Sequence, residues 1–175
     1  FDLYLVTAEN KETVVIATAP GLTSGYSGSI PMEPGATEKF QLVFPGQTVV
    51  PGSYHNGARG LQGFPDRDNN NANGQDPFLA GTPFNLAIRA VDAFWNLTDA
   101  EPVNMSLTST DPNDAGDPKA VSLTQGATTV SWTFKTANLT GWQMTIDDGE
   151  AAFDSFVSTW LPTKFGAATK LQILL

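Results

Sequence analysis

The chain has 175 residues, 41% of them hydrophobic, and a formal net charge of −9. This composition excludes a disordered chain, and the length suits one domain with attachments, or one and a half small domains. Nine scattered Lys and Arg residues form no basic stripe for phosphates, and no run approaches the ~20 apolar residues of a membrane span. We therefore expect no nucleic-acid partner and no membrane insertion. Because the chain lacks Cys, its stability must come from a packed core.

Alternating apolar and polar residues predict β-strands along the chain. The positions expected to face the core are Phe84, Leu86, Ile88 and Ala90, then Val103, Met105 and Leu107, then Val130, Trp132 and Phe134, and finally Trp142, Met144 and Ile146. Turn-forming clusters such as 111–114 and Gln125-Gly126 separate these runs. No segment sustains an apolar stripe at helical spacing. Short strands with regular turn signals predict an all-β, antiparallel fold, either a β-sandwich or a barrel.

One stretch of the sequence recurs. Residues 24–42 align with residues 155–173 at an offset of 131, which carries Ser24 to Ser155. The identical pairs are Ser24/Ser155, Ser27/Ser158, Pro31/Pro162, Gly35/Gly166, Ala36/Ala167, Lys39/Lys170 and Gln41/Gln172. Upstream, Thr7-Ala8 matches Thr136-Ala137 at an offset of 129, which a short insertion explains. We therefore expect a tandem repeat.

The recurrence predicts three parts of the chain. Residues 1–36 would be the C-terminal strands of a preceding repeat, 37–167 a complete repeat, and 168–175 the first strand of the next. The chain begins at Phe1 rather than Met, and we expect a mature product or a piece of a larger protein. A few strands cannot bury their apolar face alone, so the ends need neighbouring copies as partners. These belong either to a continuous polypeptide or to separate protomers that exchange strands.

The predicted contacts between repeats lie near the two junctions, Gly35-Ala36 and Gly166-Ala167. The residues assigned to these contacts are Gly35, Ala36, Lys39, Phe94, Trp95, Trp160, Gly166, Lys170, Leu171 and Ile173.

Four phrases carry a resemblance to a known family. They read GATEKFQLVFPGQT, AGTPFNLAIRAVDAFWNLTD, MSLTSTDPNDA and TVSWTFKTANLTG, and the most specific piece is A-V-D-x-x-x-N at Ala90–Asn96. They resemble the tandem Ig-like repeats of large bacterial secreted and surface proteins, including invasin-like modules. The resemblance implies an Ig-like β-sandwich at the cell surface, in a stalk, fibre or adhesin, without catalysis. Residues 53–77 depart from it, being longer and richer in Asn and Gly.

The sequence contains few residues that could carry out catalysis. The single histidine, His55, lies in a turn-rich segment, and no G-x-S-x-G motif is present. Zinc sites would lack ligands, and the acidic residues cluster in turns. We therefore expect no enzyme, no catalytic residue and no cofactor.

Structural calcium is the alternative to a cofactor-free protein. The segment 66–76 is rich in side-chain oxygens, and the candidate ligands are Asp66, Asp68, Asn70 and Asp76. An EF-hand is excluded, because the sixth and twelfth loop positions are Asn71 and Pro77. A plain Asn/Gly loop explains the same residues. Two further oxygen-rich candidates are Asp111, Asn113, Asp114 and Asp117, and Asp92, Asn96 and Asp99, where Asx side chains satisfying turn amides are the simpler interpretation.

Two functions remain open from the sequence. The first is a structural repeat of an extracellular filament, stalk or surface fibre. The alternative is an adhesin or a carbohydrate- or protein-binding module that uses the 53–77 loop, or Phe94 and Trp95, to hold a surface ligand. Packing at a junction between repeats is the competing interpretation of the two aromatic residues.

Overall fold

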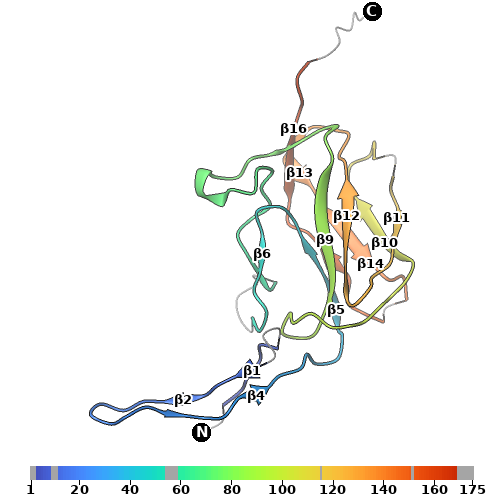
Figure 1. The fold of residues 1–175 in the computed structure, drawn as a ribbon. Coiled ribbons are helices and arrows are strands. Elements are labelled where there is room, and N and C mark those ends of the chain that lie inside the picture. The colour runs from blue at the N-terminus through green and yellow to red at the C-terminus, as the bar shows by residue number, and fades with distance from the viewer. Residues whose placement is uncertain (1–2, 9–11, 54–58, 115, 151, 169–175) are drawn as a thin grey trace, which may run out of the picture.

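The computed structural model describes residues 3–8, 12–53, 59–114, 116–150 and 152–168. In this part of the chain the regular structure is almost all β, and the single 3-10 turn is η1 (Asn71–Asn73). None of the helical structure found there is long and apolar enough to cross a membrane. We call residues 3–36 the arm and residues 37–168 the body. The arm projects from one end of the body, and the described residues that follow Lys164 leave from the opposite end (Figure 1).

The body contains two antiparallel sheets that carry most of its strands. The first has the order β12-β9-β5 and consists of β5 (Lys39–Val43), β9 (Phe84–Val91) and β12 (Ala127–Trp132). The second has the order β11-β10-β14-β15 and consists of β10 (Met105–Ser109), β11 (Lys119–Val121), β14 (Met144–Asp147) and β15 (Phe156–Val157). The prediction of an all-β protein with antiparallel sheets is confirmed.

Smaller elements complete the body. A three-stranded sheet contains β8 (Phe78–Leu79), β13 (Asn138–Trp142) and β16 (Leu161–Lys164), in which β16 pairs antiparallel with β13 and parallel with β8. A two-stranded hairpin consists of β6 (Thr48–Val49) and β7 (Leu61–Gln62).

One hydrophobic core is shared by these sheets. Strands of the first sheet contribute Leu42, Leu86, Ile88 and Val130, and strands of the second contribute Met105, Leu107, Met144 and Ile146. Aromatic rings extend the core toward β8, where Phe84 lies 4.4 Å from Phe78 and 5.4 Å from Phe134 between ring centroids. The alternating pattern predicted these inward positions except Leu42 and Phe78, which lie outside the runs it covered.

Strand β9 is buried on both faces at its C-terminal end, where a solvated face was expected. Arg89 and Val91 are buried together with Ile88 and Ala90. The Arg89 guanidinium donates to Gln41 Oε1 at 2.8 Å, and Gln41 itself is fully buried. Gln41 Nε2 donates to the carbonyls of Arg59 and Gly60, next to the β6–β7 hairpin. The hairpin side of the sheet is therefore covered, and its polar groups are satisfied by each other.

Two other strand expectations need correction. Val103 is 65% exposed, and β10 begins only at Met105, because Asn104 adopts a left-handed backbone conformation with φ of 58°. The run expected at 142–146 is divided between β13 and β14 at Gln143. Trp142 was expected in the core but is only partly buried, and its indole N–H donates to Thr136 O at 2.8 Å.

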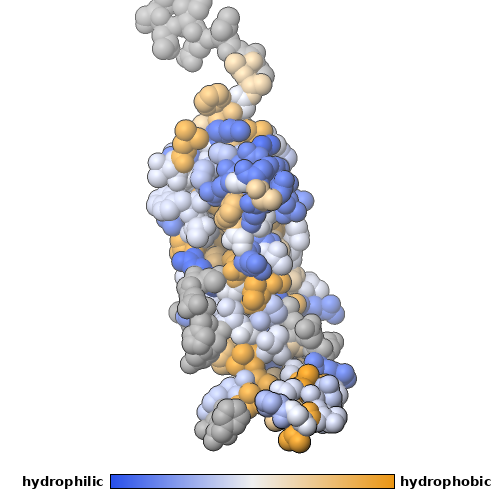
Figure 2. Space-filling view, turned by 90° about the vertical axis from the view of Figure 1, so that its left-hand side faces the viewer, coloured by the Kyte–Doolittle hydropathy of each residue, from blue (hydrophilic) through white to orange (hydrophobic). Residues whose placement is uncertain are grey.

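The arm is a long hairpin without a second layer. Its strands are β1 (Glu12–Thr13), β2 (Ile16–Ala17), β3 (Gly25–Tyr26) and β4 (Ile30–Pro31), with β1 paired to β4 and β2 paired to β3. Large hydrophobic side chains are exposed along it, among them Ile16, Leu22 and Tyr26. Figure 2 shows such hydrophobic surface on the arm, at the bottom of the view. A hairpin of this kind is marginal in isolation, so the way it is attached to the body matters.

Candidate functional site: the junction between arm and body

The A-V-D-x-x-x-N motif forms the attachment point of the arm. Strand β9 ends at Val91, and the chain then turns through residues 92–95, where Trp95 has a positive φ of 68°. Asp92 is 2% exposed, and its Oδ1 accepts the amides of Phe94 and Asn96 at 2.9 Å each. Its Oδ2 accepts the amide of Gly35 and the side-chain amide of Asn96, again at 2.9 Å. One buried carboxylate therefore holds the turn and the start of the linker.

Asn96 binds the other strand of the arm. It is also 2% exposed, and its Oδ1 accepts the amide of Ala8 at 2.9 Å. Its Nδ2 donates to Val6 O at 2.9 Å in addition to Asp92. We call Asp92 and Asn96 the junction clamp. Through it, backbone groups from both strands of the arm are fixed to the end of β9.

Close packing around the clamp restricts the arm further. Gly52 has a positive φ of 73°, and a Cβ at this position would lie 1.9 Å from Thr7 Oγ1, so only glycine fits there. On the linker side, Thr37 donates its hydroxyl to Thr98 Oγ1 at 2.7 Å, and Thr98 donates to Ala90 O. Residues 6–8 and 35–37 are thus held at several points.

Lys39 and Trp95, two of the residues predicted to contact a neighbouring repeat, contact each other inside the body. The Lys39 ammonium lies 4.4 Å from the centre of the Trp95 ring and donates to Ala93 O at 3.0 Å. Trp95 also packs edge-to-face on Phe156, with centroids 6.3 Å apart. The Trp95 ring is therefore partly buried and is not an exposed platform, while Phe94 lines a pocket between arm and body that includes Leu5.

The remaining predicted contact residues are spread over both ends of the molecule. Gly35 is held by the clamp, and the exposed Ala36 follows it. Trp160 is 52% exposed, and Gly166 lies near Ala80. Lys170, Leu171 and Ile173 lie outside the described residues, as does His55. A role of these residues between repeats stays a prediction.

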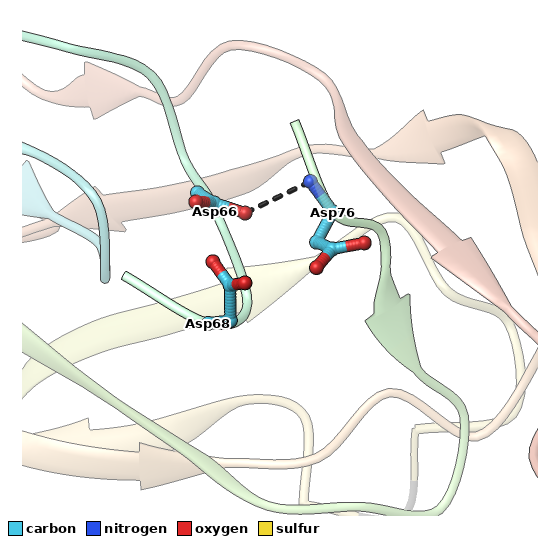
Figure 3. A group of neighbouring side chains, drawn as sticks. All are labelled: Asp66, Asp68 and Asp76. Carbon is cyan, nitrogen blue, oxygen red and sulfur yellow. Dashed lines mark hydrogen bonds between the residues drawn. The ribbon is translucent and has the colours of Figure 1, made fainter. Parts of the chain in front are cut away.

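The oxygen-rich loop brings three of its four predicted calcium ligands together. One carboxylate oxygen from each of Asp66, Asp68 and Asp76 lies within 4.8 Å of the others (Figure 3). Asp66 is fully buried, and its two oxygens accept the amides of Asn70 and Asp76 at 2.8 Å each. The side chain of Asp66 therefore ties together the two ends of the loop.

The other oxygens of this loop also have partners. Asp68 accepts the amide of Asn70 and the side-chain amide of Asn73, and Asp76 forms an ion pair with Arg67 at 3.2 Å. Asn70 Oδ1 accepts the amide of Ala72 and so caps η1. Internal hydrogen bonds account for this loop geometry, and bound calcium stays a prediction.

A second acidic cluster anchors the chain that follows β12. Asp111 Oδ2 accepts the amides of Lys135 and Thr136 at 2.6 and 2.9 Å, and Oδ1 accepts the amide of Asn113. Burial raises the pKa of this carboxyl, but the hydrogen bonds from Thr136, Asn113 and Lys135 outweigh burial and lower the pKa below its usual value. Asx side chains here satisfy backbone amides, as in the simpler of the two sequence interpretations.

Sequence reasoning named both clamp residues but not their role. It marked Asp92 and Asn96 as part of the most specific motif and as an oxygen-rich candidate, with Asp99, which is exposed in the structure. The hydrogen bonds of Asn96 to Val6 and Ala8 join residues that are 90 and 88 positions apart in the sequence, and no local pattern predicts them. The available signal was the recurrence of Thr7-Ala8 and Gly35-Ala36, which are the segments that the clamp holds.

Comparison of the chain with known protein families, with curated proteins and with solved structures gives no match.

Proposed function

We propose that this protein is a structural repeat of an extracellular filament, stalk or surface fibre built from Ig-like domains arranged head to tail. The observation that carries the proposal is the junction clamp. Its buried Asp92 accepts the amide of Gly35, which lies where the sequence recurrence places a boundary between repeats, and so fixes the segment before the body. A stalk needs junctions that keep successive domains in a defined orientation, and a buried clamp with short connections supplies this restriction.

The strand order supports the Ig-like part of the proposal. A constant-type Ig sandwich has its first, second, fourth and fifth strands in one sheet and its third, sixth and seventh strands in the other. Counted over its two main sheets, the body has its first, second and fifth strands (β5, β9 and β12) in one sheet and its third, sixth and seventh (β10, β14 and β15) in the other. Its fourth strand, β11, departs from this pattern, because it lies beside β10 in the second sheet. Both sheets contribute side chains to one core, which is the arrangement that such a sandwich requires.

The proposed role uses no catalysis, nucleic acid or cofactor. The partners are neighbouring copies of the repeat, which would also cover the hydrophobic side chains that the arm leaves exposed. An extracellular location follows from the same proposal.

The test is the mass of the native polypeptide under denaturing conditions. We expect a mass many times the 18.6 kDa of this chain, because a head-to-tail array is one continuous polypeptide. A mass near 18.6 kDa would contradict the continuous array. In that case, cross-linking of native material would show whether separate protomers complete each other's sheets.

A further inference from the structure

The arm repeats the strand pairing of the body's last strands. We call β13, β14, β15 and β16 together the closing ribbon. In the arm, Ile16 pairs with Tyr26. The two sequence offsets, 129 for the first strand and 131 for the second, carry this pair to Thr145 and Val157. These residues are paired in the closing ribbon.

The second pair of strands follows the same rule. In the arm, Thr13 pairs with Ile30, and the same offsets lead to Trp142 and Leu161, which are paired in the body. In both hairpins, two residues on the first strand and three on the second lie between these paired positions. The arm and the closing ribbon therefore share a one-residue irregularity as well as a register.

A serine makes the same hydrogen bonds at this irregularity in both places. Ser27 Oγ accepts the amide of Val15 at 2.9 Å and donates to Gly28 O at 2.7 Å. Ser158 Oγ accepts the amide of Met144 at 2.9 Å and donates to Thr159 O at 2.7 Å. Val15 and Ser27 are the positions that the offsets carry to Met144 and Ser158. The arm is thus the structural counterpart of the closing ribbon.

The backbone groups of the arm that bind the junction clamp have counterparts in the body, at the end opposite the clamp. The clamp binds Val6 O, Ala8 N and Gly35 N, and the offsets carry these groups to Lys135 O, Ala137 N and Gly166 N. Lys135 and Ala137 are exposed. Within the described part of the chain, the amides of Ala137 and Gly166 make no hydrogen bond.

We propose that this far end, Lys135–Ala137 with Lys164–Ala167, is a docking surface for the junction clamp of a second copy of the body. We call it the distal end. Asn96 of the second copy would accept the Ala137 amide and donate to Lys135 O, and its Asp92 would accept the Gly166 amide. The inference rests on the proposed function, because it supplies the head-to-tail contact that an array needs.

Charge complementarity favours this partner. In the observed junction, the acidic residues Glu33 and Glu38 line one pocket, together with Asp92. The offset of 131 carries Glu33 to Lys164. A second copy docked on the distal end would therefore place its Glu38 near Lys164, an attractive pair in place of a repulsive one. Arg67–Asp76 is the only ion pair among the described residues, so Lys164 has no carboxylate partner there.

The experiment joins residues 1–167 of the chain directly to a second copy of residues 37–175. Thr37 of the second copy then follows Ala167 as it follows Ala36 in the chain itself. Amide hydrogen exchange is measured by NMR in this tandem chain and in the original chain. We expect the Ala137 amide of the first copy to exchange about tenfold more slowly in the tandem chain, because it gains a buried hydrogen bond. The Ala8 amide, already bound by the clamp, is the internal reference.

Asn96→Ala, placed in one copy at a time, is the matched control. Asn96→Ala in the second copy should return the Ala137 amide of the first copy to fast exchange and leave the Ala8 amide slow. Asn96→Ala in the first copy should speed exchange of the Ala8 amide and leave the Ala137 amide slow. Fast exchange of Ala137 in the unaltered tandem chain would overturn the proposal, whether the second body is folded or not. Slow exchange that survives Asn96→Ala in the second copy would overturn it as well.

The charge pair gives an independent test in the same tandem chain. Lys164→Glu in the first copy should speed exchange of Ala137 by about twofold, and Glu38→Lys in the second copy should reverse this change, since exposed pairs contribute little. No response to either charge change would contradict the predicted orientation. These results do not depend on the mass of the native polypeptide. If the native mass is near that of one chain but Ala137 exchanges slowly in the tandem chain, the continuous array is contradicted and the docking surface is supported.

Discussion

The arm and the closing ribbon have the same backbone pairing and opposite environments. In the closing ribbon, Met144 and Ile146 are fully buried against the first sheet. Their counterparts by position, Val15 and Ala17, are half-buried and exposed in the arm. The arm therefore keeps this register and the serine irregularity without a second layer, although its loop between Ala17 and Gly25 is two residues shorter than the loop between Ile146 and Phe156. Burial, which supplies most of the stability, depends on a second layer that only the body provides.

The largest expected difference is in hydrophobic truncation. Met144→Ala should lower the free energy of unfolding by about 2–5 kcal/mol, because it leaves a cavity in a core position with no exposed surface. Val15→Ala, its arm counterpart, should change it by less than about 0.5 kcal/mol. Urea denaturation of both variants measures the two effects. An equal loss from both would mean that the arm unfolds with the body as one cooperative unit.

Replacing each of the two serines by alanine compares the loss of the same hydrogen bond in the closing ribbon and in the arm. Ser158→Ala should cost about 1–3 kcal/mol, because the amide of Met144 is left without its side-chain acceptor in a buried site. Ser27→Ala removes the same bond at an exposed site, where water replaces the hydroxyl. We expect no measurable change in the urea midpoint for Ser27→Ala. A comparable loss there would show that the arm carries more stability than its exposure suggests.

Acid should loosen the start of the closing ribbon through Asp111, which binds the amides of Lys135 and Thr136. The folded-state pKa of Asp111 lies below its unfolded value near 3.8, because the hydrogen bonds outweigh burial. Its stabilisation is therefore complete above that value and is lost as the pH falls through the folded-state pKa. Asp111→Asn should cost about 1–3 kcal/mol at pH 7 and less at pH 2.

Denaturation of the original chain and of Asp111→Asn at pH 7, 4 and 2 tests this expectation. The arm provides the contrast, because Thr7, the position that corresponds to Thr136, packs on Gly52 and has no carboxylate contact among the described hydrogen bonds. The Ala8 amide should therefore keep its exchange rate in Asp111→Asn. A difference between the two proteins that is independent of pH would contradict the titration argument.

The alternation of apolar and polar residues along the chain predicted much of the body's structure. The core positions of β9, β10 and β12 were predicted because each such strand presents one face to the other sheet. Alternation failed at Arg89 because the β6–β7 hairpin covers the second face of the sheet, a contact between distant segments. It failed at Val103 because Asn104 adopts a left-handed conformation that turns the backbone. Asn adopts this conformation only in some contexts, so its presence in the sequence does not predict the turn.

The candidate site shows the same division between local and distant information. The motif at Ala90–Asn96 identified the clamp residues, since Asp92 makes two of its bonds within the turn itself. Its bonds to the arm are long-range, and only the sequence recurrence pointed to those partners. Composition identified the Asp66 loop but not its chemistry. Whether carboxylates hold a cation or their own backbone amides depends on the loop conformation, and here each oxygen of Asp66 accepts an amide.

The smallest expected effect belongs to Asp114, beside Asp111. Burial raises the pKa of its carboxyl, the hydrogen bond from Ser109 opposes this, and the charges of Asp111 and Asp117 add to the rise. A raised folded-state pKa means that stability is present below the unfolded value near 3.8 and is lost as the pH rises through the folded-state pKa. Asp114→Asn should therefore raise the thermal midpoint slightly at pH 7, because the amide oxygen still accepts the Ser109 hydroxyl without a buried charge. The gain should vanish at pH 3, where Asp114 is already protonated, and a gain that persists there would assign the effect to packing rather than to charge.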